Sequence, residues 1–330
     1  MKLIVDAFGG DNAPEEIVSG VLEGMDEFNE MSVILTGDEN ILKDLLNGHR
    51  ELMPRIDIVH APERISMDEP PVNAIKKKKN SSMVVGLELL KDKSGDGFLT
   101  CGSTGAALSG ALLRVGRIKG VPRPALAPIL PNGGKGVMLI DCGANMDCKP
   151  ANLEQFAVMG DIYMKSVLRL DSPRIGLANV GTEDEKGNVL THETFLKART
   201  DINFVGNLEG RDVFDKADVI VSDGFAGNLL LKSIEGTASF LMGIIKKEFS
   251  SGLRSKMGAG LLMPSLKRIK KMMDYTEYGG APLLGIDGVI IKGHGSSNAK
   301  AVRAAVRQCA RMINADVVEI IKERLSAVEI

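Results

Sequence analysis

The segment Leu3-Ile4-Val5-Asp6-Ala7-Phe8-Gly9-Gly10-Asp11-Asn12-Ala13-Pro14-Glu15-Glu16 sets a pattern that the rest of the chain repeats. Its short apolar run predicts a buried strand, and the glycine and small polar residues predict a loop directly after it. Proline followed by two acidic residues is typical of the first turn of a helix, where negative charge is favourable. Apolar residues at helical spacing between positions 17 and 25 predict that this helix covers the strand. The segment is therefore one strand–loop–helix unit of an α/β protein.

The same unit recurs along the chain, which has 330 residues. Further strands are expected at residues 33–35, 56–59, 98–99, 137–140, 175–178, 202–205, 219–221 and 289–291. Single helices are expected over residues 72–91 and 296–325. We therefore predict one α/β domain over 1–330, with a Rossmann-like open parallel or mixed sheet and helices on both faces. Over residues 252–285 the alternation gives way to Gly-, Met- and Lys-rich sequence, which we interpret as a helical excursion.

The composition excludes several classes of protein. Lys and Arg number 41 against 43 Asp and Glu, and Trp is absent, so neither charge nor aromatic stacking favours nucleic-acid binding. No apolar run reaches the ~20 residues of a membrane span, and Asp6 comes too early for a secretory signal. The four cysteines contain no Cys-x-x-Cys pair and are too sparse for a disulfide framework. We therefore expect a soluble, cytoplasmic protein.

Six of the expected loops combine glycine with Asn, Ser, Thr or Asp at the end of a strand: residues 6–12, 102–105, 141–147, 179–183, 222–228 and 293–298. In open parallel sheets, ligands bind at the carboxyl ends of the strands, and glycine lets backbone N–H groups approach an anion. We therefore expect these loops to converge at one edge of the sheet and to form an anion site. The spacing matches neither a dinucleotide-binding fingerprint nor a Walker loop, which disfavours nicotinamide and ATP.

These loops, in this order, closely resemble the bacterial phosphate acyltransferases of phospholipid synthesis. The resemblance is carried by residues 6–12, 141–147, 179–187, 204–212, 223–228, 278–285 and 294–298. It implies transfer of a fatty acyl group from acyl-acyl carrier protein to inorganic phosphate, giving an acyl phosphate for a membrane glycerol-3-phosphate acyltransferase. It also implies a homodimer without bound nicotinamide, with a fold similar to that of the isocitrate and isopropylmalate dehydrogenases. The chain departs from the family at Ser103, where the family usually has Asn.

Four residues are candidates for catalysis. His294 is the only one of the four histidines in a Gly-Ser loop at a strand end, where it could donate to the thioester oxygen, protonate the leaving thiolate or merely brace its loop. Lys186 could be the cation that holds phosphate, or a solvated surface lysine. Asp223, like Asp141, is either an acid–base group or the cap of the next helix. Asn228 is either a substrate hydrogen-bond donor or part of a loop-locking turn.

A larger set of loop residues is expected to bind phosphate or the acyl group. For each of them the alternative is a structural role in the turn of its loop. The set is Asp6, Gly9, Gly10, Asn12, Ser103, Thr104, Gly105, Asn145, Asn179, Ser296 and Ser297. Acidic clusters such as Asp184-Glu185 lack His or Cys at ligand spacing, so we expect no metal. We expect no cofactor either.

The excursion contains a basic amphipathic stretch. Six basic residues and one acidic residue lie between 254 and 274. Such a helix could contact an anionic membrane or the acidic carrier protein, or lie in a dimer interface. The expected contact residues are Leu266, Lys267, Arg268, Ile269, Lys270, Lys271 and Met273.

Two other functions stay open at this stage. One is a short-chain phosphotransacetylase that uses coenzyme A, although the Met- and Lys-rich excursion favours a large carrier and a long acyl chain. The other is a protein without catalytic activity that binds the carrier protein and docks on a membrane.

Overall fold

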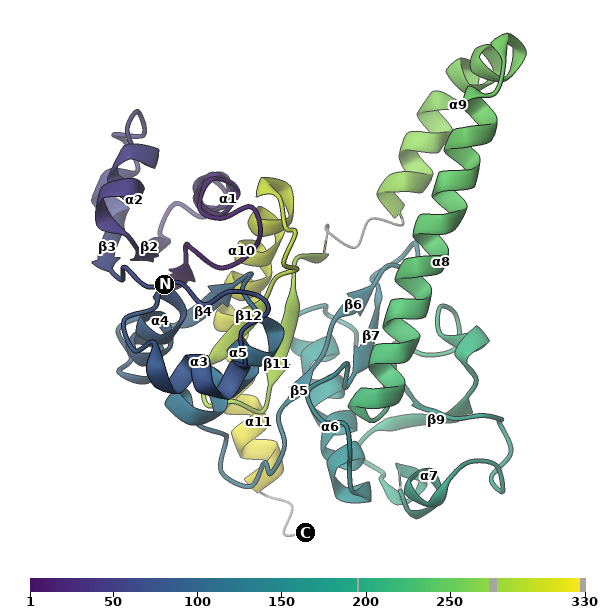
Figure 1. Ribbon diagram of the computed structural model, residues 1–330. Helices are drawn as coiled ribbons and strands as arrows, with labels where there is room; N and C mark the ends of the chain where they lie inside the picture. Colours follow the sequence, from purple (N-terminus) through teal and green to yellow (C-terminus); the bar gives the residue numbers. More distant parts are fainter. Residues whose placement is uncertain (195, 273–277, 327–330) are drawn as a thin grey trace.

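A computed structural model of the protein describes residues 1–194, 196–272 and 278–326. Its strands form two sheets instead of the single sheet that the alternation suggested, and the two sheets form two lobes side by side (Figure 1). The first has the order β3 (Ile56–His60), β2 (Ser32–Gly37), β1 (Lys2–Asp6), β4 (Gly97–Thr100), β12 (Val289–Lys292), β11 (Ala281–Leu284) and β5 (Ala125–Leu126). The second has the order β6 (Ile129–Leu130), β7 (Val137–Ile140), β10 (Val219–Val221), β8 (Arg174–Ala178) and β9 (Asn203–Leu208).

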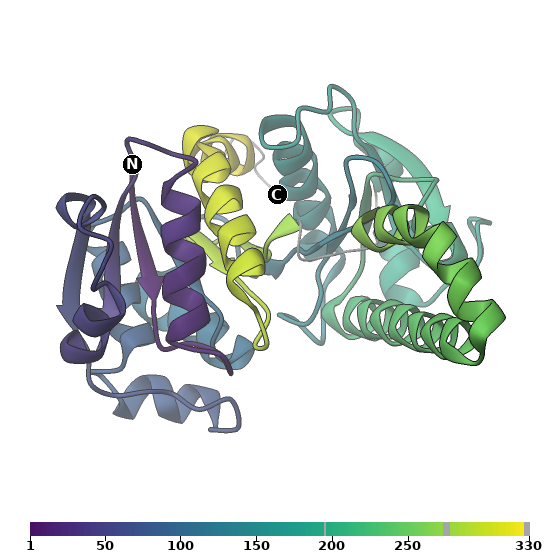
Figure 2. The same ribbon diagram turned by 90° about the horizontal axis from the view of Figure 1, so that it is seen from above.

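Most of the pairing is parallel, as predicted. In the first sheet β3, β2, β1, β4 and β12 run parallel, and β11 pairs antiparallel with β12 and β5. In the second sheet β7, β10, β8 and β9 are parallel, and β6 is antiparallel to β7. The arrow of β1 in Figure 2 points toward the face drawn in Figure 1, so the first sheet's carboxyl ends lie on that face. The predicted α/β class with a mixed sheet is confirmed.

Helices cover both faces of each sheet because alternate strand residues are buried on opposite sides. Leu3 and Val5 pack toward α1 (Glu15–Met25) and α10 (Ala299–Asn314), which lie together in Figure 2. Ile4 packs on the other side, toward α3 (Pro71–Lys77), α4 (Ser82–Lys91) and α5 (Thr104–Gly110). In the second lobe, α6 (Pro150–Ser166) covers one face and α8 (Gly224–Ser250) the other. The short helices α2 (Glu39–Leu45) and α7 (Val189–Glu193) complete the lobes.

The helical excursion is longer at its start than predicted. α8 and α9 (Leu253–Met272) form a hairpin that projects away from the lobes (Figure 1). The excursion thus begins at Gly224, directly after β10, because the 27-residue helix α8 passes beyond the sheet that it covers. At the other end, residues 281–284 form strand β11 and belong to the first sheet.

Two expected single helices are each two helices. The helix predicted over residues 72–91 is interrupted between α3 and α4. There the Ser81 side chain caps α4 by accepting from Val84 N at 3.4 Å. The 296–325 prediction is interrupted between α10 and α11 (Val317–Ser326), where Asp316 has a φ of +49°. A residue with positive φ cannot continue an α-helix. Apolar periodicity extends across both breaks and therefore hides them.

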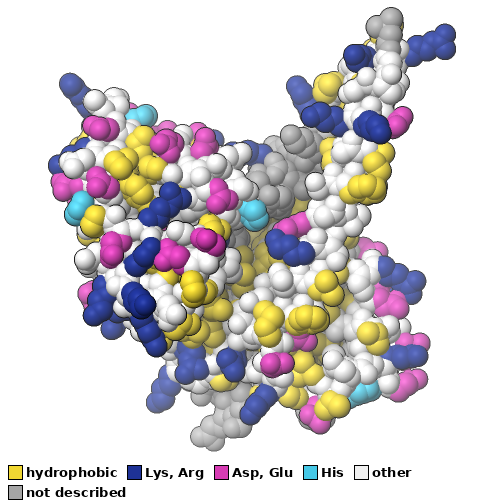
Figure 3. Space-filling view, in the orientation of Figure 1, with side chains coloured by type: hydrophobic (Ala, Val, Ile, Leu, Met, Phe, Trp, Pro, Cys, Tyr) yellow, Lys and Arg dark blue, Asp and Glu magenta, His cyan; other side chains and the backbone are white. Residues whose placement is uncertain are grey.

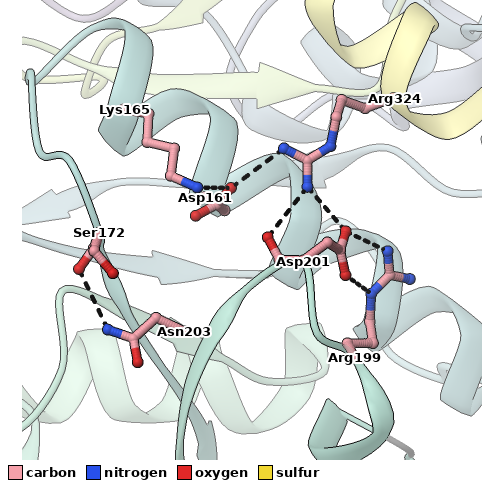
Figure 4. Close-up of polar contacts among 7 residues, drawn as sticks. All are labelled: Asp161, Lys165, Ser172, Arg199, Asp201, Asn203 and Arg324. Carbon is pink, nitrogen blue, oxygen red and sulfur yellow. Dashed lines mark hydrogen bonds and ion pairs between the residues drawn. The ribbon is translucent and has the colours of Figure 1, made fainter.

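An ion-pair cluster joins the C-terminal helix to the second lobe (Figure 4). Arg324 of α11 lies 2.9 Å from an oxygen of Asp201 and 3.6 Å from Asp161 of α6. Arg199 also binds Asp201, through two hydrogen bonds of 2.8 and 2.9 Å, and Lys165 binds Asp161 at 2.9 Å. The two arginines hold the pKa of Asp201 well below its ordinary value. α11, which follows the first lobe in sequence, is thereby attached to the second.

A second ion pair joins α1 to α10. Glu27 accepts two hydrogen bonds of 2.7 Å from Arg307 and another bond from Arg303. These arginines lower the pKa of Glu27 to about 2. The folded protein therefore binds a proton at this site less readily than the unfolded chain does.

We predict that Glu27→Gln destabilises the protein by about 1 kcal/mol at pH 7, a modest value because the pair is partly exposed. The contribution of ionised Glu27 to the free energy of unfolding is fully present above pH ~4.5. It is lost as the pH falls toward the pKa of about 2 that Glu27 has in the folded protein. Urea unfolding of both proteins at pH 7, 4 and 3 should show the difference shrinking with acidity. Glu30→Gln is the control, since that side chain is exposed on the same segment. An equal loss at every pH would contradict the assignment.

Candidate functional site

The six glycine-containing loops divide equally between the two sheets instead of sharing one edge. Residues 6–12, 102–105 and 293–298 follow the adjacent strands β1, β4 and β12 of the first sheet. Residues 141–147, 179–183 and 222–228 follow β7, β8 and β10, which are adjacent in the second. The expectation of a single edge is therefore wrong, and any shared site must lie between two groups of three loops. A recess separates the two lobes on the face drawn in Figure 3.

The three first-lobe loops are packed tightly against one another. Asn12 Nδ2 donates to the carbonyls of Ser296 and Ser297 at 3.1 and 3.2 Å, and Asp11 N donates to Gly295 O at 2.8 Å. A Cβ at Gly9 would lie 2.4 Å from Asp6 Oδ2, and one at Gly10, whose φ is +109°, would lie 2.9 Å from Gly295 O. These contacts between loops explain Asn12 and both glycines without reference to a ligand.

Asp6 lies beneath these loops and is fully buried. Its Oδ2 accepts from Thr100 Oγ1 at 2.7 Å, and Thr100 Oγ1 accepts in turn from Gly102 N at 3.0 Å. Its Oδ1 is buried and has no hydrogen-bond partner within residues 1–194, 196–272 and 278–326. Burial raises the pKa of Asp6 because the charged form loses solvation. Asp6 is therefore a buried polar group with unused acceptor capacity beside the strand ends.

The loop after β4 provides one structural cap and one exposed hydroxyl. Ser103 is buried, and its Oγ accepts from Ala106 N at 3.5 Å at the start of α5. Thr104 is exposed. A Cβ at Gly105 would lie 2.6 Å from Pro71, so this glycine lets α5 approach α3. Among these three predicted residues, the exposed Thr104 is the one best placed to meet a ligand.

His294 is exposed at the end of β12. Its Nδ1 accepts from Ser296 N at 3.2 Å and lies 2.8 Å from Ser296 Oγ. A backbone N–H at Nδ1 assigns the proton of the neutral ring to Nε2. Partial burial and the nearby Lys232 ammonium lower the pKa of His294. The lowered pKa favours the neutral ring, and the contact with Ser296 N places the N–H of that form on Nε2.

In the second lobe, Asp141 is completely buried and hydrogen-bonded on both oxygens. Oδ1 accepts from Leu126 N at 2.9 Å and Ala144 N at 3.1 Å. Oδ2 accepts from Asn145 N at 2.7 Å and Asn145 Nδ2 at 3.0 Å, and Asn145 Nδ2 also donates to Pro124 O at 2.7 Å. The next helix, α6, has Lys149 at its N-cap, so Asp141 is not the helix cap that the sequence analysis offered. Its carboxylate stabilises the loop after β7 instead, and the predicted ligand contact Asn145 is committed to the same network.

The start of α8 packs directly onto that network. Asp223 caps the helix through Oδ1, which accepts from Ala226 N at 2.8 Å. A Cβ at Gly227 would lie only 1.9 Å from Asp141 O. Asn228 is exposed, and the position of a Cβ on Gly143 is 3.7 Å from its side chain. The predicted residues Asn145, Asp223 and Asn228 are therefore neighbours.

Asn179 and Lys186 belong to a separate loop after β8. Asn179 Nδ2 donates to Lys186 O at 2.9 Å, and its Oδ1 accepts from Val180 N at 2.8 Å. Lys186 is exposed, and its backbone N donates to Glu183 O at 3.2 Å. These contacts hold the loop together, but they do not join either residue to the His294 loop.

Charged residues of α8 connect the two lobes electrostatically. Lys232 and Glu235 of α8 both act on His294, and Lys232 also acts on Lys292 of β12. A small void of about 10 Å³ is lined from both sides, by Thr104 and Lys292 of the first lobe and by Ala144 of the second. The start of α5 and the end of β12 therefore lie beside the loop after β7, and Lys232 and Glu235 of α8 are close enough to act electrostatically on His294.

The sequence analysis missed two features of this region. Lys292 is a buried lysine, and its only sequence signal is a charge at the end of an otherwise apolar strand. The second feature is apolar side chains left in solvent at the second lobe's strand ends: Val180, Phe225 and Leu229 are 77%, 65% and 61% exposed. Large exposed apolar side chains beside a polar site commonly mark a binding surface.

The predicted contact residues lie in the second half of α9, which returns from the hairpin tip toward the lobes (Figure 1), and Arg268 lines a cavity together with residues of α6 and α10. Lys267, Arg268 and Ile269 of α9 are exposed, and Leu266 is half-buried. The side chains of Lys270 and Lys271, and all of Met273, lie outside the described residues. Elsewhere on the hairpin Phe240, Met257 and Leu261 are exposed as well. No helix within the described residues has the length and apolar character needed to cross a bilayer.

A larger cavity of about 940 Å³ lies away from the strand-end loops, between α6, α9 and α10. Its lining includes Lys135, Arg169 and Arg311 but no residue of the six loops. The convergence of the loops, not the size of this cavity, therefore places the candidate site between the lobes.

Comparison with known proteins agrees with the resemblance seen in the sequence. A family model described as fatty acid synthesis protein matches residues 1–320. The phosphate acyltransferase of Thermoanaerobacter pseudethanolicus is 48% identical over 329 residues, covering 99% of this chain and 98% of that protein. The phosphate acyltransferase of Caldanaerobacter subterraneus subsp. tengcongensis is 51% identical over 327 residues, covering 98% and 97%.

Solved structures with the same fold are more distant in sequence. A phosphotransacetylase from Streptococcus pyogenes superposes with a TM-score of 0.61 at 16% identity, covering 97% of this chain and 94% of that chain. A 4-hydroxythreonine-4-phosphate dehydrogenase from Klebsiella pneumoniae gives 0.53 at 13% identity, covering 95% and 99%. At these identities the likeness establishes the fold alone.

Two glycines of α8 should respond oppositely to substitution by alanine. We predict that Gly227→Ala lowers the free energy of unfolding by at least about 2 kcal/mol, because the added methyl group would overlap the Asp141 carbonyl oxygen. Gly243→Ala should raise the free energy of unfolding by about 0.5 to 1 kcal/mol, because no atom of the described residues lies within 4 Å of the added Cβ and alanine favours helix. Denaturant unfolding measures both. A Gly227→Ala protein as stable as the wild type would contradict the described packing of α8 on the loop after β7.

Proposed function

Since the chain belongs to the phosphate acyltransferase family, we propose that it transfers a long-chain acyl group from acyl-acyl carrier protein to inorganic phosphate. The products are an acyl phosphate and free carrier protein. The observation that carries this proposal is the near full-length match at 48–51% identity to phosphate acyltransferases. The meeting of strand-end loops from both lobes supports it, because an anion and a thioester must be held side by side.

The chemistry asks three things of the site. A phosphate oxygen attacks the thioester carbonyl, the carbonyl oxygen takes up negative charge, and the C–S bond breaks to release a thiolate. Phosphate is already nucleophilic, so orientation and charge stabilisation supply most of the acceleration. Neutral His294 donates its Nε2 hydrogen to the developing oxyanion. This role requires a neutral ring with Nδ1 occupied, as the contact with Ser296 provides.

We place phosphate between the exposed hydroxyls of Thr104 and Ser296 and the exposed amide of Asn228. Lys232 is the cation beside His294 in this arrangement, and Lys186 is a second candidate from the neighbouring loop. The acyl chain lies over the exposed Phe225 and Leu229, next to Asn228 in α8. Asp6, Asn12, Ser103 and Ser297 support the loops from beneath, and Asp141 and Asn145 do so in the second lobe. The whole chain thus acts as one catalytic unit, since both lobes supply ligand contacts.

Outside the site, the proposal assigns the projecting hairpin to a membrane surface. Its exposed Lys267 and Arg268 suit anionic headgroups, and Phe240 and Leu261 suit the acyl region. A peripheral position at the cytoplasmic membrane would deliver the acyl phosphate to a membrane glycerol-3-phosphate acyltransferase. The acidic carrier protein is the alternative partner of the basic face. We also propose that the protein functions as a homodimer.

One assay tests the activity and separates the alternatives. Long-chain acyl-acyl carrier protein is supplied with and without phosphate, while free thiol and hydroxylamine-trapped acyl product are measured. Release of thiol that requires phosphate supports the proposal. Turnover of acetyl-coenzyme A alone would identify a short-chain phosphotransacetylase, and tight binding without turnover would identify a non-catalytic module.

We predict that His294→Gln lowers kcat by about 100-fold, because the N–H donor to the oxyanion is displaced. His49→Gln, at an exposed histidine four residues after the end of α2 and outside the six loops, is the matched control and should keep full activity. Lys186→Met should raise KM for phosphate if that lysine binds the anion. Unchanged kcat in His294→Gln would show that the site is misplaced.

Charge reversal on the hairpin tests the membrane proposal. The double variant Lys267→Glu/Arg268→Glu should lose most of its binding to vesicles with 30% phosphatidylglycerol, because electrostatic attraction contributes ~1 kcal/mol per basic residue. Wild-type binding should weaken in high salt. Acyl transfer in solution should be unaltered. If the variant binds vesicles normally but fails with acyl-acyl carrier protein, the basic face binds the carrier instead.

A further inference from the structure

Lys292 is an unusual residue for its position. It ends β12, is only 7% exposed, and its ammonium donates to the carbonyl of Gly293 and, at 3.5 Å, to that of Cys101. Both acceptors among the described residues are therefore backbone oxygens, and they belong to the loops after β4 and β12. A buried ammonium without a hydrogen-bonded carboxylate carries a desolvation cost that an apolar residue would avoid.

The Gly293 carbonyl belongs to the peptide that leads directly into His294. On the other side of His294, the Nδ1 atom is fixed by Ser296 N. Gly293 itself is packed so closely that a Cβ would lie 2.5 Å from Cys101 Sγ. The ring is thus held from two directions, by Lys292 through the preceding peptide and by Ser296 at the imidazole.

We propose that Lys292 is a positioning residue for His294: by clamping the Gly293 and Cys101 carbonyls, its ammonium fixes the backbone from which the imidazole N–H points toward the reacting thioester. The catalytic meaning of this inference rests on the proposed function, whereas the structural relation between the two residues does not. Lys292 itself touches no substrate in this scheme. It acts only through His294 and the loop after β4.

The electrostatics of the region are consistent with this role. Among the described residues, the charged groups that act on His294 include Lys232 and Glu235 of α8, Lys292 of β12 and Asp11 of the loop after β1. The positive charges of Lys232 and Lys292 lower the pKa of His294, whereas Asp11 and Glu235 raise it. Burial lowers the pKa of Lys292, and the Asp6 and Asp11 carboxylates oppose that shift. Removal of the Lys292 charge should therefore raise the pKa of His294.

The test uses three variants of the full chain. Lys292→Met removes the charge and both hydrogen bonds, and Lys292→Arg retains a cation and donors. Gln308→Met is the matched control, because Gln308 is 5% exposed and its hydrogen bonds lie outside the six loops. Its Oε1 accepts from Gly280 N and its Nε2 donates to Tyr163 OH, each at 2.9 Å. If Lys292→Met does not fold, Lys292→Gln takes its place, since it keeps N–H donors without the charge.

Two measurements are made on each protein. NMR titration of the imidazole carbons, with the His294 signal assigned from His294→Gln, should show an upward shift of the His294 pKa in Lys292→Met. Lys292→Arg and Gln308→Met should titrate as the wild type does. In the acyl-transfer assay, kcat of Lys292→Met should fall by about 10- to 100-fold while KM for phosphate changes by less than about threefold, because positioning, not phosphate binding, is lost. Lys292→Arg should recover most of kcat.

The outcomes are separable. An unchanged His294 titration in Lys292→Met or its glutamine substitute overturns the inference, and so does a normal kcat in an active enzyme. A fall in kcat that Gln308→Met reproduces would show general destabilisation and would also overturn it. If the wild type transfers no acyl group to phosphate, the proposed function fails, while the NMR titration still decides whether Lys292 controls His294.

Discussion

The buried carboxylate of Asp141 holds the two halves of this molecule in register. One of its oxygens accepts the N–H of Leu126, which lies in a strand of the first sheet, and both oxygens accept N–H groups from the loop after β7 in the second. α8 begins on top of the same loop, with Gly227 against the Asp141 carbonyl. Since α8 carries Lys232 toward His294, this side chain contributes directly to the alignment of the two groups of loops, together with the Arg324 ion pairs between α11 and the second lobe.

Packing between loops, not ligand binding, accounts for many of the residues that drew attention first. Gly9 and Gly10 allow the loop after β1 to lie against the loops after β4 and β12. Asn12 joins the loop after β1 to the loop after β12 through its hydrogen bonds to two carbonyls. The side chains at the exposed surface near the two groups of loops are Thr104, His294, Ser296, Phe225, Asn228 and Leu229. In such a site, buried and hydrogen-bonded loop residues fix the positions of a few exposed side chains. This arrangement suits catalysis in which the reacting groups are held in the right orientation.

The sequence predicted the α/β class and all six loops because strand runs and glycine turns are local signals. It did not predict that β5 and β6 divide the strands into two sheets, since strand pairing depends on contacts between distant segments. The breaks at Ser81 and Asp316 were hidden because apolar periodicity continues through them. Side-chain roles were harder still: Asp141 and Lys292 both follow apolar strands, yet one is fully hydrogen-bonded to backbone and side-chain N–H groups and the other donates to carbonyls. Only three-dimensional partners distinguish these cases.

The length of the α8–α9 hairpin has a geometric consequence. A helix of 27 residues extends about 40 Å, and only its first turns lie against the second lobe. The strand ends of the first sheet look toward the viewer in Figure 1, whereas the hairpin points up and to the side. A protein attached to a lipid surface along this hairpin would therefore keep its reacting groups, which lie on the lobes, outside the lipid contact. A macromolecular donor could then dock and depart through open solvent while the enzyme stays anchored.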